Sequence, residues 1–292
     1  MSENTYILVS PVKDEEQYIE RTIHAVLAQT VRPYKWIVVD DGSRDRTRSI
    51  VERYGHQYSW ITVVSLPTGG VRQPGSGIIR AFNVGYKAAK ELEFDFIVKF
   101  DCDIEFPPDY FERLIAEFHK DDKLGIASGI YLEEKAGEWE PVKMPAYHAA
   151  GQTKVVRAAC FEEIGGFVES RGWDTIDEIR AREKGWNTRH FEELYFLHLK
   201  KEGSGIGFLR TNAMHGEIFY LTGGSGSFFA LKLLHRFVFG RPFIVGGIMM
   251  LYGFMKSWCS KRPKLVSKPE ERLYRHMLHQ RIIERLSGSL AL

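Results

Sequence analysis

The sequence predicts an α/β protein with a doubly wound, mostly parallel sheet and a helical C-terminal extension. Short apolar runs rich in β-branched and aromatic residues alternate with segments of helical periodicity, and polar residues directly follow several of these runs. Strands that alternate with helices form parallel sheets joined by right-handed crossovers. With 292 residues, the chain is long enough for two modest domains, which we expect at 1–200 and 201–292.

Five segments are predicted to be strands because each is short, largely apolar and bounded by turn-forming or polar residues. In chain order they lie at 6–9, 36–39, 61–66, 94–100 and 124–132. Helices are predicted where apolar residues recur three or four positions apart. Their apolar positions are Ile19, Ile23, Val26 and Leu27; Ile50, Val51 and Tyr54; the stretch 78–92; and Tyr110, Leu114 and Phe118. Ser43 is expected to cap the second of these helices.

Two aspartates, Asp101 and Asp103, follow the fourth predicted strand. In open α/β sheets, ligands bind beyond the carboxyl ends of the strands. Carboxylate oxygens at this position suit Mg²⁺ or Mn²⁺, which is usually shared with phosphate oxygens and water. The competing interpretation is an ordinary surface turn, because so short a motif also occurs by chance. The position directly after a strand favours the metal role.

The composition indicates a folded protein, and we expect no nucleic-acid partner. Apolar residues make up 44% of the chain and charged residues 27%, and the formal net charge is only +2. Three widely spaced cysteines, Cys102, Cys160 and Cys259, indicate a reducing compartment rather than a disulfide framework. The N-terminal stretch MSENTYILVS lacks the basic start and apolar core of a secretory signal. We therefore expect a cytoplasmic location.

Two common nucleotide-binding motifs are missing from the sequence. No G-x-G-x-x-G follows the first predicted strand, and no G-x-x-x-x-G-K-[ST] occurs anywhere. Their absence disfavours a dinucleotide-dependent dehydrogenase and a P-loop nucleotidase.

Four ordered blocks resemble the family 2 glycosyltransferases, which have the Rossmann-like GT-A fold. Within about residues 5–190 the blocks read VSPVKDEEQYIERTI, WIVVDDGSRDRT, FIVKFDCDIEFPPDYFERL and IGGFVESRGWDTIDEIRAREKGW. The resemblance implies a metal-dependent enzyme that moves a sugar, with inversion, from a nucleoside diphosphate donor to an acceptor hydroxyl. The expected donor is a UDP-sugar, and the expected acceptor is a saccharide or a lipid-linked molecule in surface polysaccharide or glycolipid synthesis.

The same resemblance implies which residues bind the nucleotide sugar. Pro11, Asp14 and Glu15 would line the base pocket, and Asp41 would contact the base or the ribose. Asn83 and Asp101 complete the expected nucleotide-sugar contacts.

Asp101 and Asp103 also match the family's metal motif, so the resemblance implies Mg²⁺ or Mn²⁺ as cofactor. A bound cation acting as a Lewis acid stabilises the charge that grows on a diphosphate leaving group. Related enzymes often use a late histidine as a further metal or diphosphate contact. His198 is our choice for this role, and His215 is the reserve.

Inverting transfer needs a base that takes the acceptor's proton on the face opposite the leaving group. The resemblance places Asp174 in this role, with Trp173 where the family usually has Glu. Asp177, one helical turn along, is the alternative catalytic residue. A purely structural interpretation makes Asp174 the cap of the helix that starts there.

The C-terminal third is rich in glycine, aromatic and basic residues. Its longest apolar run, 243–255, would rise about 20 Å as a helix, which is short of the roughly 30 Å core of a bilayer. Two interpretations of residues 228–264 stay open: helices in a membrane interface, peripheral on the inner face of the cell membrane, or a helical subdomain that packs on the sheet. Residues 269–286 predict a closing amphipathic helix.

Two other classes of function compete with sugar transfer. The first is a catalytically inactive sugar-nucleotide-binding or scaffold protein of the same fold, and Trp173 in place of Glu is its best support. The second is a phosphatase or hydrolase that uses the aspartate pair, although such enzymes normally carry the pair after the first strand.

Overall fold

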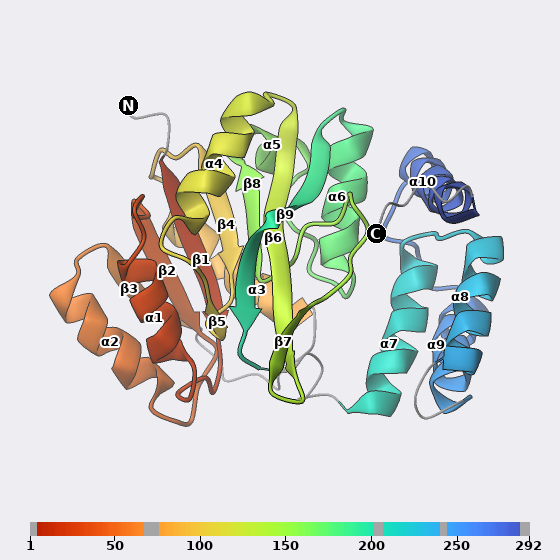
Figure 1. Ribbon diagram of the computed structural model, residues 1–292, viewed down its shortest axis with the longest axis horizontal. Helices are drawn as coiled ribbons and strands as arrows, with labels where there is room; N and C mark the ends of the chain where they lie inside the picture. Colours follow the sequence, from red (N-terminus) through yellow and green to blue (C-terminus); the bar gives the residue numbers. More distant parts are fainter. Residues whose placement is uncertain (1–4, 67–75, 201–206, 240–243, 287–292) are drawn as a thin grey trace. The chain divides into compact units, whose positions relative to one another are not determined.

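The structure is a computed structural model that describes residues 5–66, 76–200, 207–239 and 244–286 (Figure 1). The chain divides into two compact units, Met1–Lys201 and Glu202–Leu292. The first unit contains the sheet and its covering helices, and the second is helical.

A nine-stranded sheet forms the centre of the first unit (Figure 1). Its strands follow the order β3-β2-β1-β4-β8-β6-β9-β5, with β7 paired to β6 off this path. The strands are β1 (Tyr6–Val12), β2 (Lys35–Asp40), β3 (Ile61–Ser65), β4 (Phe96–Phe100), β5 (Ile104–Glu105), β6 (Leu124–Lys135), β7 (Glu138–Pro141), β8 (Thr153–Arg157) and β9 (Asn187–His198).

The sheet is mixed, but most of its strands point the same way. Strands β1, β2, β3 and β4 are parallel neighbours, and β6 and β9 are parallel to each other. Because β8 is antiparallel to both β4 and β6, strand β6 runs in the direction of β4. The carboxyl ends of β1, β2, β4 and β9 therefore meet at one edge of the sheet.

Helices cover both faces of the sheet, as a doubly wound fold requires. Successive strand residues point to opposite faces. Leu8 and Trp36 pack in a core with residues of α1, α2 and α4, whereas Ile7 and Ile37 pack in a second core with residues of α3, α5 and α6. These helices are α1 (Ile19–Leu27), α2 (Thr47–Gln57), α3 (Ser76–Ala88), α4 (Tyr110–Lys120), α5 (Ala158–Glu163) and α6 (Trp173–Glu183).

The fold class predicted from the sequence is confirmed, including its helical C-terminal extension. All five predicted strands and the predicted helices of the first unit are present, with boundaries shifted by a few residues. The cap was wrong, because α2 begins at Thr47 and its first backbone N–H donates to Asp45, whereas Ser43 serves a neighbouring turn. Strands β5, β7, β8 and β9 were not predicted.

The second unit consists, in its described part, of helices α7 (Phe208–Leu221), α8 (Gly226–Phe239), α9 (Val245–Cys259) and α10 (Lys268–Leu286). The last of these is the predicted closing helix. Helix α9 packs against α7 and α8 (Figure 1). None of the described helices is both long enough and apolar enough to cross a membrane.

Helix α3 lies so close to the sheet that only glycine fits at position 85. A Cβ atom there would lie 2.5 Å from a methyl group of Val9 and 2.8 Å from one of Val39. We expect Gly85→Ala to lower the free energy of unfolding by about 1 kcal/mol or more, because overpacking outweighs the better helix propensity of alanine. Urea unfolding followed by tryptophan fluorescence measures this.

The matched control is Gly226→Ala at the start of α8, where an added Cβ would meet nothing within 4 Å. It should leave stability unchanged or raise it slightly. A Gly85→Ala chain that is as stable as the wild type would contradict the close helix–sheet packing.

Candidate active site

Two turns at the carboxyl ends of β1 and β2 hold each other in place. The backbone N–H of Asp14 donates to Ser43 Oγ (3.1 Å), and that of Arg44 donates to Asp14 Oδ1 (2.8 Å). The N–H of Glu15 donates to Thr47 Oγ1 (2.7 Å). Asp14 adopts a left-handed backbone with φ of 55°. These bonds fix the segment after β1 beside the segment after β2. Three of the predicted nucleotide contacts, Asp14, Glu15 and Asp41, therefore come from neighbouring turns, and Pro11 lies near the end of β1.

Asp41 differs from the other residues of these turns in the surroundings of its carboxylate. Its side chain is buried, and its N–H donates to the carbonyl of Val12 (2.9 Å). Its Oδ1 atom is buried and accepts no hydrogen bond from any residue that the structure describes. A buried carboxylate oxygen without a donor is costly, so such an atom usually marks the place of a missing ligand or water.

Asp103 and His198 are brought together by the pairing of β5 with β9, which sets Ile104 opposite His198. His198 Nε2 lies 3.6 Å from Asp103 Oδ2, and its Nδ1 lies 3.5 Å from Glu133 Oε1. Burial lowers the pKa of His198, but the carboxylates of Asp103, Asp101 and Glu133 outweigh it and raise the pKa overall. The predicted reserve, His215, lies on α7 in the second unit.

Asp101 stands beside this pair and is held by a buried lysine. Lys99 Nζ donates to Asp101 Oδ1 (2.6 Å), and the backbone N–H of Asp101 donates to Gln152 (2.9 Å). Burial raises the pKa of Asp101, with a smaller contribution from Asp103, although Lys99 opposes both.

The side chains of this cluster are of the kinds that bind a divalent cation. Two carboxylates and an imidazole suit Mn²⁺ or Mg²⁺, and the field of Asp101 and Asp103 reaches His198. Within the described ranges, however, no three acidic, histidine or cysteine side chains already stand in a metal-holding arrangement. One oxygen of Asp101 is already paired with the ammonium of Lys99.

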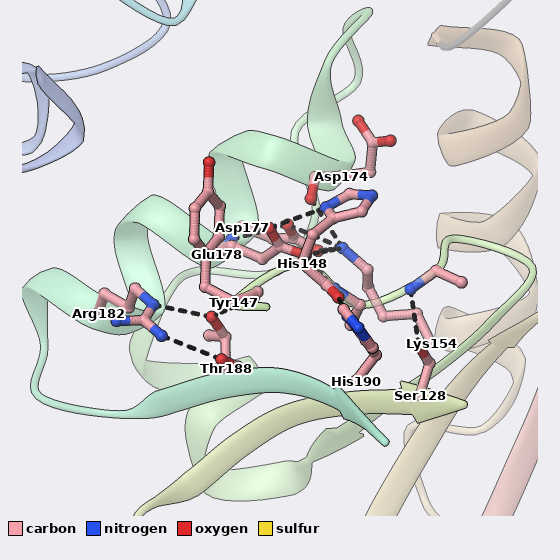
Figure 2. A network of polar contacts seen from close by, with 12 residues as sticks. Ser128, Tyr147, His148, Lys154, Asp174, Asp177, Glu178, Arg182, Thr188 and His190 are labelled. Atoms are coloured by element: carbon pink, nitrogen blue, oxygen red, sulfur yellow. Dashed lines mark hydrogen bonds and ion pairs between the residues drawn. The ribbon is translucent and has the colours of Figure 1, made fainter. Parts of the chain in front are cut away.

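A second acidic group lies on α6 around the buried Lys154 of β8 (Figure 2). Lys154 Nζ contacts both carboxylate oxygens of Asp177 (3.1 and 2.9 Å), Glu178 Oε1 (3.1 Å) and the carbonyl of Asp174 (2.8 Å). Burial lowers the pKa of Lys154, but Asp177, Glu178 and Asp174 outweigh it and raise the pKa. The ammonium therefore fixes the first turn of α6.

Asp174 and Asp177 have different surroundings within this group. Asp177 is 1% exposed and locked against Lys154, and burial raises its pKa. Figure 2 shows the carboxylate of Asp174 directed away from Lys154, while its carbonyl accepts the lysine bond. The helix begins at Trp173 with Gly172 as its N-cap residue, so Asp174 is not the cap.

The segment before β8 is tied to α6 and to β9 by successive polar contacts (Figure 2). The carbonyl of Tyr147 accepts from Thr188 Oγ1 (2.7 Å), and that of His148 accepts from His190 Nδ1 (2.8 Å). Buried Glu178 accepts from the N–H of Ala149 (2.8 Å) and contacts His148 Nδ1 (3.0 Å). These contacts join the segment before β8 to both α6 and β9.

The ring of Trp173 lies close to both Lys99, which pairs with Asp101, and Lys154, which pairs with Asp177. Lys99 and Lys154 are direct cross-strand partners on β4 and β8. Their Nζ atoms lie 5.5 and 5.2 Å from the centre of the Trp173 ring. An aromatic face attracts cations, so the indole that replaces the usual Glu contacts both ammonium groups.

Asn83 is placed differently from the other predicted residues. It lies on α3, and its side-chain amide donates to Glu169 Oε1 (2.8 Å). This hydrogen bond joins Asn83 to the loop before α6 rather than to Asp41, Asp101 or Asp103.

The sequence matches the family described as Glycosyl transferase family 2 over residues 7–175, which is more than half of the chain. The chain belongs to this family. Among its curated relatives, the uncharacterized glycosyltransferase EpsJ of Bacillus subtilis (strain 168) is 29% identical over 126 residues. That match covers 43% of this chain and 34% of EpsJ, so the chain spans about a third of the length of that relative.

Solved glycosyltransferase structures share the fold over nearly the whole chain. TarS 1–349 of S. aureus in complex with UDP-GlcNAc has a TM-score of 0.54 and 19% identity, covering 97% of this chain and 83% of that one. The mannosyltransferase PcManGT from Pyrobaculum calidifontis, in complex with GDP-Man and Mn²⁺, has a TM-score of 0.54 and 14% identity, covering 96% and 86%. These likenesses show the GT-A fold of this family 2 member.

Five residues of the site were missed by sequence reasoning: Lys99, Glu133, His148, Lys154 and Glu178. Lys99 carried a signal, because a lysine inside the apolar run FIVKF must find a buried partner. Glu133, His148 and Lys154 come from strands or loops whose pairing the sequence does not reveal. Glu178 lies on α6, and its partners Lys154 and His148 are known only from the structure.

The contact of His148 with Glu178 predicts a pH-dependent contribution to stability. Burial lowers the pKa of His148, but Glu178 outweighs it and the net pKa is raised, while that of Glu178 is lowered. The contribution is therefore fully present below the unfolded histidine pKa of about 6.5 and is lost as the pH rises through the folded value. We expect His148→Gln to lower the melting temperature more at about pH 5.5 than at about pH 9.

His56→Gln is the control, because His56 is exposed on α2 and contacts no carboxylate in the described part of the chain. Its effect should be equal at both pH values. An equal effect of His148→Gln at both pH values would show that the imidazole gains nothing from Glu178.

Proposed function

We propose that this chain is a metal-dependent, inverting glycosyltransferase that uses a nucleoside diphosphate sugar, with a UDP-sugar as donor. The observation that carries the proposal is the gathering of acidic residues after strands whose carboxyl ends share one sheet edge. Asp41, Asp101 and Asp103 follow β2 and β4, and His198 ends β9. Membership of family 2 and the GT-A fold agree with it.

The nucleotide would bind over the turns after β1 and β2. Asp41 Oδ1 is suited to accept a hydrogen bond from the base or ribose, because it is buried and lacks a donor within the described chain. Pro11, Asp14 and Glu15 would form the wall of the base pocket, and Lys200 Nζ holds Glu15 Oε1 at 2.6 Å. Asn83 remains a proposed contact of the donor.

Asp101, Asp103 and His198 would hold Mg²⁺ or Mn²⁺. When bound, the cation would neutralise charge on the diphosphate as it leaves. Lys99 would contribute from the protein side, because its ammonium lies 2.6 Å from Asp101 and brings a positive charge to the same place.

Asp174 is the proposed base. The acceptor hydroxyl would give its proton to the Asp174 carboxylate as its oxygen bonds to the anomeric carbon. The bond from that carbon to the diphosphate oxygen breaks, and its electron pair leaves with the nucleotide. Asp177 is less suited, since a raised pKa would favour a base but both its oxygens contact Lys154.

The acceptor is proposed to be a saccharide or a lipid-linked molecule in surface polysaccharide or glycolipid synthesis. A lipid-linked acceptor would require the enzyme to work at the cytoplasmic face of a membrane. Residues 228–264 are the proposed place of peripheral contact, because they are both apolar and basic.

Loss of Asp103 tests the metal role. We expect Asp103→Ala to abolish the Mn²⁺-dependent rise in melting temperature that a bound donor causes by mass action, and to abolish transfer. A thermal-shift screen of UDP-, GDP- and TDP-sugars with and without chelator measures the first effect. The control Asp122→Ala removes an exposed acid on the loop before β6 and should behave like the wild type. Donor binding that survives both chelator and Asp103→Ala would remove the metal from the proposal.

Separate substitution of the two α6 aspartates tests which of them is the catalytic base. Asp174→Asn should lower kcat by about 10²-fold or more, as loss of a general base does, with donor affinity and melting temperature unchanged. Asp177→Asn should instead lower the melting temperature, because it removes a partner of buried Lys154.

Tight donor binding without turnover by the wild type, across many acceptors, would favour the inactive binding protein.

A further inference from the structure

Helix α9 buries mainly small residues and exposes most of its large apolar ones, which is unusual for a helix surrounded by water. The residues that it buries are mostly small: Gly246, Gly247, Gly253 and Ser257, together with Met250. Most of its large apolar residues face outward instead, and Phe254 is an exception, because its ring stacks on that of Phe229. In water-soluble helices the large apolar side chains form the buried face, so α9 reverses the usual pattern.

The buried face of α9 packs by direct backbone contact with α7. A Cβ atom on Gly253 would lie 1.9 Å from the carbonyl oxygen of Ala213, and one on Gly216 would lie 1.8 Å from that of Met250. Only glycine fits at these two positions. Packing of helices through small residues is typical of helix pairs in lipid, where burial of large side chains gives no advantage.

The outward residues give α8 and α9 each an exposed apolar side. Most of them recur at intervals of three or four residues, so they lie on one side of each helix. Each is 38–70% exposed. The α8 residues are Leu231, Leu234, Val238 and Phe239, and the α9 residues are Val245, Ile248, Leu251, Tyr252, Met255 and Trp258. An exposed apolar surface of this extent marks an interaction site.

The charge of this region identifies the kind of partner. Residues 218–269 contain no Asp or Glu, but they contain eight basic residues: Lys232, Arg236, Arg241, Lys256, Lys261, Arg262, Lys264 and Lys268. Arg262 pairs with Glu217, and Lys264 and Lys268 pair with Glu271. Lys256 and Lys261 are exposed, and neither forms an ion pair with any residue that the structure describes. Apolar residues beside unneutralised cations complement a bilayer with anionic headgroups.

The length of α9 determines whether it spans the bilayer or lies in the interface. Helix α9 has 15 residues, which as a helix is about 22 Å long and too short for a hydrocarbon core of roughly 30 Å. It therefore suits a position in the plane of the interface, with its outward side chains in the upper acyl layer.

We propose that α8 and α9 insert their outward apolar surface into one leaflet of an anionic membrane, with Lys256 and Lys261 at the headgroups. This inference rests on the membrane contact proposed above and names its partner, its depth and its residues. It does not depend on sugar transfer, because insertion is measured without donor or acceptor.

The experiment uses the full chain and vesicles made of phosphatidylcholine and phosphatidylglycerol in equal parts, or of phosphatidylcholine alone. Flotation measures binding. Trp258 is the only tryptophan after residue 200, so quenching by lipids brominated in the acyl chain reports its insertion. We expect binding to anionic vesicles with quenching that Trp258→Phe abolishes.

Two variants separate insertion from simple adsorption. Ile248→Ser/Leu251→Ser/Met255→Ser should weaken vesicle binding at least about tenfold, because the transfer of apolar surface out of water is lost. Lys256→Glu/Lys261→Glu should weaken binding to anionic vesicles and leave neutral ones unaffected. The control Tyr34→Ser/Ile283→Ser changes two exposed residues outside these helices and should bind like the wild type. Equal melting temperatures confirm that the variants fold.

Several results would overturn the proposal. Failure of the wild-type chain to bind anionic vesicles would do so, as would binding that high salt removes and that never quenches Trp258, since this is electrostatic adsorption alone. Self-association in the absence of lipid that the triple serine variant abolishes would assign the surface to a second copy of the chain. In each case activity on a water-soluble acceptor, if present, would show that the transferase proposal stands.

Discussion

The charges of two neighbouring lysines inside the sheet are the constraint on which the candidate site depends. Lys99 and Lys154 are buried side by side on β4 and β8, and a buried cation is tolerated only when it is paired. Lys99 finds Asp101, and Lys154 finds Asp177 and Glu178. The need to neutralise these two charges therefore orients both acidic groups of the site.

The tryptophan between the lysines gives the departure from the usual family pattern a physical meaning. A glutamate at position 173 would add another negative charge beside Asp177 and Glu178. The Trp173 ring contacts both ammonium groups without adding charge. The substitution is thus consistent with an intact acidic group on α6, which weakens the case for a protein that has lost its chemistry.

The local parts of the fold could be predicted from the sequence, and the long-range parts could not. Periodicity located the strands around Phe100 and Trp36, because apolar patterning is a local property. The position of Asp101 beyond a strand end followed from the same pattern. The contacts of His148 with Glu178 and of Lys154 with Asp177 depend on an antiparallel strand inserted between β4 and β6, and nothing local in the sequence signals that pairing. The likeness to the family supplied Asp174, whereas only the structure distinguishes its surroundings from those of Asp177.

The glycine contacts between α7 and α9 have a consequence for how the second unit tolerates a change of solvent. Gly216 and Gly253 let the two backbones touch, so close packing contributes to the cohesion of this pair in addition to the exclusion of water. A helix pair held in this way keeps its geometry whether its outer side faces water or hydrocarbon. The same fold could therefore exist in the aqueous phase and at a lipid surface without rearranging its interior.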